Sequence, residues 1–171
     1  SMPNTDPTAD AAEIIESIIT KAASTPVDVY PIGAATIERK GEVLAPIGEL
    51  IEAGAVAFSD DGVAIKTAGI LRRVMEYASM YDAPVIEHCE DESMAGGSMN
   101  EGLNSTRFGL TAVPPIAEEL TVARDIMMAE YTGARVHIAH ISTAKAVQLV
   151  REGKAKGISV TAEVAPHHFT L

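Results

Sequence analysis

The sequence predicts an α/β fold built on parallel strands. Apolar, β-branched runs alternate with segments whose apolar residues recur at helical spacing, and the alternation repeats five times. At 171 residues, with 47% hydrophobic and 22% charged residues, the chain is long enough for one domain with a sizeable core. Repeated strand–helix alternation implies parallel strands with right-handed crossovers, either in a doubly wound sheet or in part of an eight-stranded barrel. No Gly-rich phosphate loop follows a predicted strand, which disfavours a nucleotide-binding doubly wound sheet.

The first half of the chain predicts two helices and two strands. A helix over residues 10–23 follows Asp6 and Pro7, which suit a helix start, and four isoleucines share its apolar face: Ile14, Ile15, Ile18 and Ile19. A strand and its exit loop are predicted over 25–36, a helix over 46–53, and a second strand over 53–62. This second strand ends in two adjacent carboxylates, Asp60 and Asp61, before Gly62.

The second half continues the alternation, with one interruption. Helices are predicted over 68–81, 115–131 and 144–152, the last capped by Ser142 or Thr143. Strands are predicted over 83–91, 134–143 and 157–168. Residues 90–114 contain four glycines and predict a long loop after the third strand, and loops of that length are often functional.

Charge and cysteine content exclude several classes of function. The formal net charge of −11 argues against sequence-independent binding to nucleic acid or to an anionic membrane surface. No apolar run reaches the length of a transmembrane helix. The single cysteine, Cys89, cannot form an internal disulfide, so we expect a cytoplasmic protein.

Polar residues follow four of the five predicted strands. The second strand ends in Asp60 and Asp61, the third in residues 88–91, the fourth in His140, and the fifth in Glu163 and residues 167–168. In barrels and in open α/β sheets, ligands bind at the carboxyl edge of the strands. Imidazole and carboxylate groups that converge there suit zinc and similar divalent cations.

Each of these residues also has a purely structural interpretation. Asp60 and Asp61 suit a turn, and a lone His88 suits a hydrogen-bonded structural histidine. His137 and His140 are an odd number of residues apart on a predicted strand, so we expect only one to face inward and the other to pack. Cys89 suits a small buried side chain. An aspartate and two histidines on three successive strands nevertheless indicate a metal site more specifically than any one of them does alone.

Seven short motifs resemble, in this order, those of type I dihydroorotases: "MPNT" (residues 2–5), "VYPIGAAT", "FSDDG", "EHCED", "STRFGL" (105–110), "AHIST" and "TAEVAPHH". These enzymes belong to the amidohydrolase superfamily of metal-dependent (β/α)8 TIM barrels, and the resemblance covers essentially the whole chain after Ser1. It implies an incomplete barrel with about five parallel βα units, corresponding to barrel strands 3–7. Residues 1–171 would form one partial barrel domain, with the first, second and eighth strands outside the chain.

The resemblance also assigns roles to residues. It implies that Asp61 (with Asp60 as the alternative), His88 and His140 bind zinc, that Asn4 contacts substrate, and that His137 packs. Hydantoinases carry a carboxylated lysine where Asp61 sits, and Lys66 does not occupy that position. The family's His-x-His motif, its nearby substrate-binding arginine and its general-base aspartate are missing, and the aspartate is expected after Leu171. We therefore expect no catalytic residue in this chain and no hydrolysis by it alone.

The implied function is that of an enzyme fragment. Type I dihydroorotases interconvert N-carbamoyl-L-aspartate and L-dihydroorotate, small molecules of pyrimidine biosynthesis, by cyclic amide hydrolysis. One alternative is a non-catalytic dihydroorotase-like subunit that scaffolds aspartate carbamoyltransferase, against which the retention of Asp61, His88 and His140 counts. Another is a hydantoinase-like hydrolase. Because an incomplete barrel exposes strand edges, we expect a homo-oligomer, or association with the rest of the enzyme.

Overall fold

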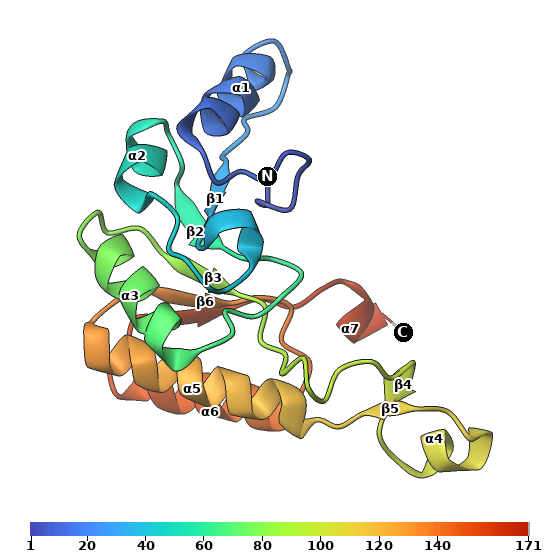
Figure 1. Ribbon diagram of the computed structural model, residues 1–171. Coiled ribbons are helices and arrows are strands. Elements are labelled where there is room, and N and C mark those ends of the chain that lie inside the picture. The colour runs from blue at the N-terminus through green and yellow to red at the C-terminus, as the bar shows by residue number, and fades with distance from the viewer. Residues whose placement is uncertain (171) are drawn as a thin grey trace.

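The main feature of the structure is a sheet of five parallel strands in chain order (Figure 1). The computed structural model describes residues 1–170. The strands are β1 (Ile32–Ala34), β2 (Ala57–Ser59), β3 (Val85–Glu87), β6 (Val136–Ile138) and β7 (Val160–Ala162), and each pairs in parallel with its neighbour in the order β1-β2-β3-β6-β7. Each is shorter than the predicted segment that contains it. The predicted number, direction and order of the strands are confirmed.

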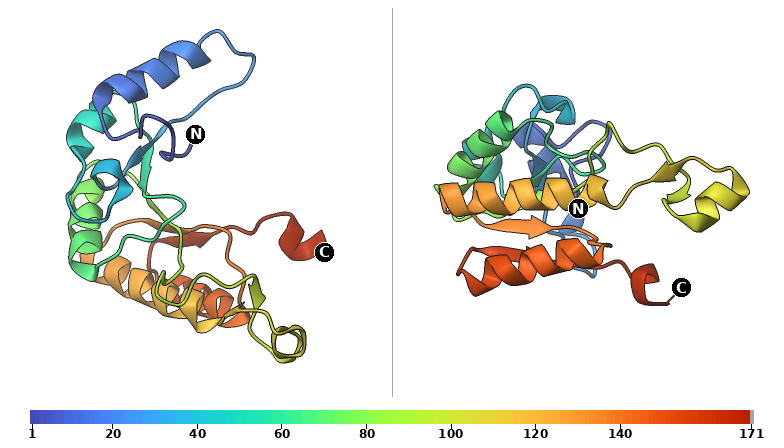
Figure 2. Two further views of the ribbon diagram at one scale, coloured as in Figure 1. Left: turned by 45° about the vertical axis from the view of Figure 1, so that its right-hand side comes forward. Right: turned by 90° about the horizontal axis from the view of Figure 1, so that it is seen from below.

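The five predicted helices are also confirmed, and they lie along the outer, convex side of the sheet (Figure 2). They are α1 (Ala12–Ala22), α2 (Ile47–Glu52), α3 (Ala68–Ser79), α5 (Ile116–Thr132) and α6 (Ala144–Ala155). A short 3-10 turn, η1 (Ile37–Arg39), follows β1, and α7 (His167–Thr170) follows β7. Because the strand order never reverses, right-handed crossovers place successive helices on one face. This arrangement is that of part of a barrel and excludes the doubly wound alternative.

Helices α6 and α1 are positioned in different ways. Thr143 accepts a hydrogen bond from Ala146 N (3.2 Å) and so caps α6, which selects it over Ser142. The expectation for α1 was wrong, because Asp6 and Pro7 lie in the loop before the helix and the N-cap position is held by Ala11. No side chain caps α1. Its position is set instead by apolar burial, with Ile15 fully buried.

The core lies between the sheet and the helices. Phe58, Val85, Val136 and Val160 occupy one register row of the sheet and are all buried against helical residues such as Leu71. Burying a side chain of this size stabilises the fold by about 1.5–3 kcal/mol. Within residues 1–170, no helix is both long and apolar enough to cross a membrane.

The segment after β3 is more ordered than the sequence predicts. Residues 90–114 contain two short parallel strands, β4 (Met99–Asn100) and β5 (Ala112–Val113), and a helix, α4 (Leu103–Phe108). We call residues 99–113 the arm, because they project from the body of the molecule (Figures 1 and 2). The prediction of a plain loop was wrong because two of its glycines bound a helix. Gly102 precedes α4, and Gly109 ends it with a φ of +64°.

The two edges of the sheet differ. Beside β1, the N-terminal segment supplies backbone acceptors: Ser1 O accepts from Ile32 N (2.9 Å), and Ala9 O accepts from Ala34 N (2.8 Å). In the part of the chain that the structure describes, β7 pairs only with β6. An apolar groove of about 340 Å³ lies beside it, lined in part by Ile141, Val147, Val150 and Val164. The edge at β7 is therefore the more exposed of the two.

Candidate metal centre

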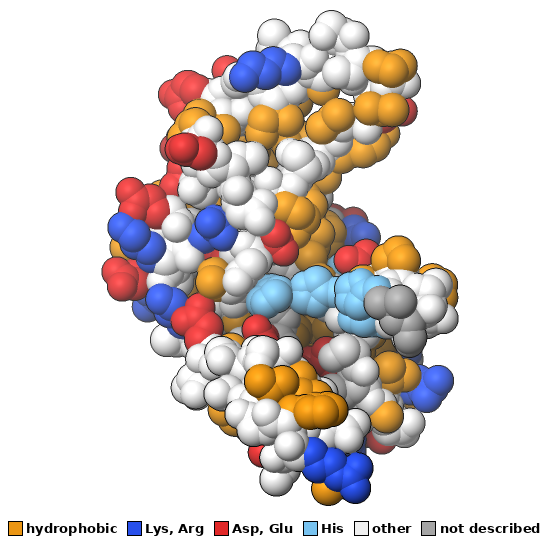
Figure 3. All heavy atoms as spheres, turned by 90° about the vertical axis from the view of Figure 1, so that its right-hand side faces the viewer, with side chains coloured by type: hydrophobic (Ala, Val, Ile, Leu, Met, Phe, Trp, Pro, Cys, Tyr) orange, Lys and Arg blue, Asp and Glu red, His pale blue; other side chains and the backbone are white. Residues whose placement is uncertain are grey.

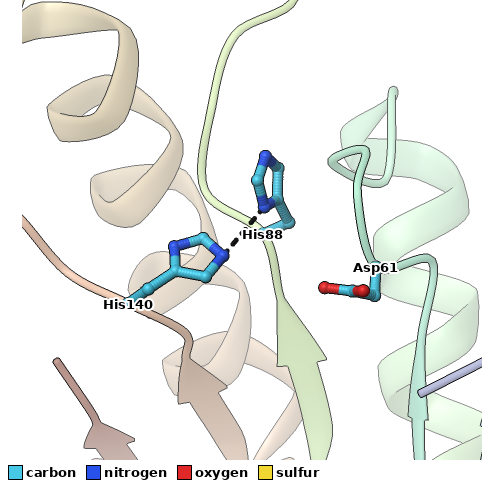
Figure 4. Close-up of side chains that lie close together, drawn as sticks. All are labelled: Asp61, His88 and His140. Carbon is cyan, nitrogen blue, oxygen red and sulfur yellow. Dashed lines mark hydrogen bonds between the residues drawn. The ribbon is translucent and has the colours of Figure 1, made fainter. Parts of the chain in front are cut away.

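Three of the predicted site residues meet at the carboxyl edge of the sheet (Figure 4). Asp61 follows β2, His88 follows β3 and His140 follows β6, three strands that are neighbours in the sheet. One possible ligand atom from each side chain lies within 4.8 Å of those of the other two. All three side chains are partly buried, so the group is held by the fold and remains accessible to solvent. The predicted convergence of these three residues is confirmed.

The two histidines contact each other directly. His88 Nδ1 lies 2.9 Å from His140 Nε2, and the rings meet edge to face with centroids 4.7 Å apart. One ring nitrogen must donate its hydrogen to the other at this distance. Both nitrogens therefore point into the same small volume, and the Asp61 carboxylate faces it from the neighbouring strand (Figure 4).

Asp61 is held by contacts on both its backbone and its side chain. Its backbone N donates to Ser59 Oγ (3.0 Å), and its carbonyl oxygen accepts from Arg39 Nη1 (2.6 Å). Asn4 Nδ2 donates to Asp61 Oδ2 (2.9 Å). The structure thus places Asn4, the predicted substrate contact, directly beside the candidate ligand carboxylate.

The adjacent Asp60 has a different role. Its carboxylate is almost completely buried and accepts three hydrogen bonds, from Ala35 N (3.0 Å), Thr36 N (2.9 Å) and Thr36 Oγ1 (2.6 Å). Burial raises the pKa of Asp60, while the bonds from Thr36 and Ala35 oppose the rise. Because both of its oxygens bind the segment after β1, Asp60 ties two strand ends together. Asp61, and not Asp60, is the aspartate whose carboxylate lies close to the two histidines.

The structure corrects the alternation argument for His137 and His140. Strand β6 ends at Ile138, and His140 lies beyond it in a turn with a φ of +36°, so alternation along a strand does not govern its direction. His137 lies between the buried residues Val136 and Ile138 in β6 and is itself partly buried. Its Nδ1 is 2.8 Å from Thr161 Oγ1. His137 thus has a hydrogen-bond partner on the neighbouring strand β7, and its expected packing role stays a prediction.

Glu118 supports the segment that follows His140, a contact that the sequence did not predict. From the first turn of α5, its carboxylate accepts hydrogen bonds from Ser142 N (2.7 Å), Ser142 Oγ (2.8 Å) and Thr143 N (2.7 Å). The carboxylate also lies at the N-terminus of α6, where negative charge is stabilising. The helical pattern of residues 115–131 gives no sign of this contact, because its partners are mostly backbone groups of another element.

A second unpredicted group of polar residues lies under the site, between β3 and α5. Glu87 and Asp125 are completely buried, and Arg124 contacts both, with Nε 2.7 Å from Asp125 Oδ1 and Nη2 3.6 Å from Glu87 Oε2. Burial raises the pKa of both carboxyl groups. Cys89 Sγ donates to Asp125 Oδ2 (3.2 Å). Cys89 is thus a small buried residue, as predicted.

A pocket opens beside the candidate ligands. It has a volume of about 610 Å³, a size that suits a small molecule. Its lining includes His88 and His140, polar groups such as Asn100 at the base of the arm and Ser142, and the histidine pair His167 and His168. Figure 3 shows histidine side chains in a row across the middle of this hollowed face. The histidine pair after the fifth strand, whose role the sequence left open, therefore lines the same pocket as the candidate ligands.

Comparisons with known proteins agree with this geometry. The sequence model of a family described as "Dihydro-orotase-like" matches residues 1–146. The chain is 57% identical over 171 residues to a dihydroorotase of Pelotomaculum thermopropionicum and 52% identical over 172 residues to one of Acetivibrio thermocellus. In both cases 99% of this chain is covered but only 40% of the relative. The chain therefore spans about two fifths of the length of these curated relatives.

Solved structures share the fold. The whole chain superposes on an L-hydantoinase from Arthrobacter aurescens with a TM-score of 0.81 at 18% identity, covering 40% of that protein. A D-hydantoinase from a Thermus species gives a TM-score of 0.70 at 22% identity, over 99% of this chain and 39% of that protein. At these identities the likeness concerns the fold alone.

Proposed function

Since this chain belongs to the dihydroorotase-like family, we propose that it is the central part of a metal-dependent dihydroorotase. In this proposal the whole enzyme interconverts N-carbamoyl-L-aspartate and L-dihydroorotate in pyrimidine biosynthesis. The observation that carries the proposal is the convergence of Asp61, His88 and His140 at the carboxyl edge of three adjacent strands.

The donor set fits a divalent cation. One carboxylate and two imidazoles are ligands that zinc accepts, and the three side chains come from three strand ends that the sheet holds together. We propose zinc, with Asp61, His88 and His140 as its ligands in this chain. When bound, zinc would supply Lewis-acid polarisation of the amide carbonyl and a lowered pKa for bound water.

The residues of the chain have separate tasks in this proposal. The two histidines must offer unprotonated ring nitrogens to the cation, so their mutual hydrogen bond is replaced when it binds. Asn4 uses one amide hydrogen on Asp61 Oδ2, and its second amide hydrogen remains for an oxygen of the substrate carboxylate. The pocket beside the site receives the rest of the small, polar substrate.

We also propose that residues 1–171 form one partial barrel domain that other parts of a longer protein complete. The sequence contains no His-x-His motif, and the general-base aspartate of the family's last strand has no counterpart in it. Without a group to transfer the proton, hydrolysis should fail even with metal bound. The isolated chain is therefore expected to be inactive.

The test uses the full-length protein that contains this segment. Metal content is measured by mass spectrometry, and dihydroorotate hydrolysis by the loss of ultraviolet absorbance. Asp61→Ala, His88→Ala and His140→Ala should each lose bound metal and activity. His137→Ala is the matched control, because it removes a histidine from the same strand region outside the cluster, and it should keep both.

Two results would overturn the proposal. Full metal content in all three ligand variants would show that the cluster does not hold the ion. Metal binding without any turnover by the full-length protein would favour the non-catalytic, scaffolding alternative.

A further inference from the structure

Arg39 lies in an unusual backbone segment beside the candidate metal centre. Glu38 and Arg39 are consecutive residues with φ of +52° and +56°, a left-handed backbone conformation that residues other than glycine rarely adopt. Two such residues in a row persist only where surrounding contacts determine their conformation. The segment therefore has contacts that hold it in place.

Three hydrogen bonds hold this segment, two of them local and one from a distant part of the chain. Asp10 Oδ2 accepts from Glu38 N (2.7 Å), Val43 O accepts from Ile37 N (2.9 Å), and Thr36 Oγ1 accepts from Gly41 N (2.9 Å). The backbone N and the hydroxyl of Thr36 in turn donate hydrogen bonds to the buried carboxylate of Asp60. The segment is thus fixed to the loop before α1 and to the end of β2 at the same time.

This backbone conformation directs the Arg39 side chain to the turn that carries Asp61. Arg39 Nη1 donates to Asp61 O (2.6 Å) and lies 3.4 Å from Asp60 O. Arg39 Nε is buried without a hydrogen-bond partner, and within residues 1–170 no carboxylate forms a salt bridge with this guanidinium. A full positive charge is therefore partly desolvated and bound to backbone carbonyls.

Arg39 adds to the other contacts of Asp61, which are the backbone hydrogen bond to Ser59 Oγ and the side-chain hydrogen bond from Asn4. Asp61 lies two residues beyond the end of β2 and is followed by Gly62, with a φ of +85°. Its only side-chain hydrogen bond among the described residues is to Asn4, itself exposed. Because Arg39 binds carbonyl oxygens of the turn, it does not occupy the oxygens of the Asp61 carboxylate, which stay available to a cation.

We propose that Arg39 is a positioning residue of the metal centre: it holds the carbonyls of Asp60 and Asp61, and so keeps the Asp61 carboxylate directed at His88 and His140. This inference rests on the proposed function, because it requires that the three residues bind a metal. Arg39, a residue of η1, would then support the metal centre without contacting the ion. This role would explain why the left-handed segment of Glu38 and Arg39 lies beside the turn that carries Asp61.

The test is Co²⁺ binding by the metal-free, full-length protein, followed by visible absorption, which reports the ligands around the ion. Arg39→Met removes the guanidinium with little loss of length. It should weaken Co²⁺ binding at least tenfold and change the intensity or position of the absorption bands. Arg39→Lys keeps the charge and one donor group and should restore part of both. Arg73→Met, on the exposed side of α3, is the matched control and should behave as the unaltered protein.

Circular dichroism of each variant separates loss of folding from loss of positioning. If Arg39→Met does not fold, Arg39→Lys decides the question, because a folded Lys variant with an altered spectrum supports the inference. Unchanged Co²⁺ affinity and spectrum in a folded Arg39→Met protein would overturn it. If Arg39→Met does not fold, unchanged affinity and spectrum in a folded Arg39→Lys protein would overturn it. Failure of the unaltered protein to bind Co²⁺ would overturn the metal centre itself, and this inference with it.

Discussion

Substitution of the adjacent aspartates Asp60 and Asp61 by alanine should affect two different properties, the stability of the fold and the binding of metal. Asp60→Ala is expected to destabilise the fold strongly and Asp61→Ala only slightly, whereas Asp61→Ala should abolish metal binding. The two residues are neighbours in sequence and identical in chemistry, so the comparison isolates what the tertiary contacts of each carboxylate do.

The magnitude for Asp60 follows from its contacts. Alanine would leave two buried donors without an acceptor, Thr36 N and the Thr36 hydroxyl, whereas Ala35 N would keep its second acceptor, Ser59 O. Each unsatisfied buried group costs about 1–3 kcal/mol, and relaxation or entry of water reduces the sum of the two, so we expect a loss of about 2–4 kcal/mol. Release of the carboxylate from burial offsets a part of this cost, as the raised pKa of Asp60 indicates. The loss is large against a domain stability of about 5–15 kcal/mol.

Asp60→Asn provides an intermediate case. The amide oxygen can still accept from Ala35 N and Thr36 N, and the amide nitrogen can donate to the Thr36 hydroxyl, so we expect about half the loss caused by alanine. For Asp61→Ala the lost contact is one hydrogen bond to the exposed Asn4, with an expected cost of about 1 kcal/mol or less.

The assay is urea unfolding followed by circular dichroism, with metal content measured on the same samples. Equal m-values would show that the variants differ in stability and not in the surface exposed on unfolding. A cost below about 1 kcal/mol for Asp60→Ala would refute the argument from buried hydrogen bonds. Equal destabilisation by both alanine variants would refute the division of roles between the two residues.

Three further predictions concern other parts of the structure. Glu118→Ala removes three hydrogen bonds at the N-terminus of α6 and should cost about 2–3 kcal/mol in urea unfolding, and an unchanged midpoint would contradict it. Cys89 should resist an aromatic disulfide reagent at pH 8, because burial raises the pKa of its thiol well above its usual value. Its reaction should follow the unfolding curve, and fast labelling of the folded protein would count against the buried position. The isolated chain should associate at micromolar concentration through its open sheet edge, and light scattering that shows a cooperatively melting monomer would disprove this.

Much of the fold could be predicted because it depends on periodic patterns. Alternating strands and helices imply parallel pairing, and parallel strands bring their carboxyl ends to one edge, so the meeting of Asp61, His88 and His140 follows from the order of elements. The choice between Asp60 and Asp61 could not be made from sequence. It depends on Thr36, whose hydroxyl donates a hydrogen bond to the Asp60 carboxylate from 24 residues away along the chain.

Two physical causes explain what the sequence missed. Glu118 and Arg39 act mainly on backbone groups of distant segments, and a backbone group leaves no residue-specific signal. The helix of the arm was missed because Gly102 and Gly109, which bound it, also suggest a loop. Tertiary contacts decide the first two, whereas local glycine geometry that the sequence leaves ambiguous decides the third.

The order of strands in the sheet has a consequence for how the molecule assembles. Each strand pairs with the strand made just before it in the sheet, so a nascent chain can add strands one at a time as it leaves the ribosome. The pairing of β3 with β6 must close over the arm, but closure entropy grows slowly, by about 0.6 kcal/mol for each doubling of loop length. A change in the length of the arm should therefore cost little in closure entropy. The three candidate ligands come together only after β6 has been synthesised and has docked on β3.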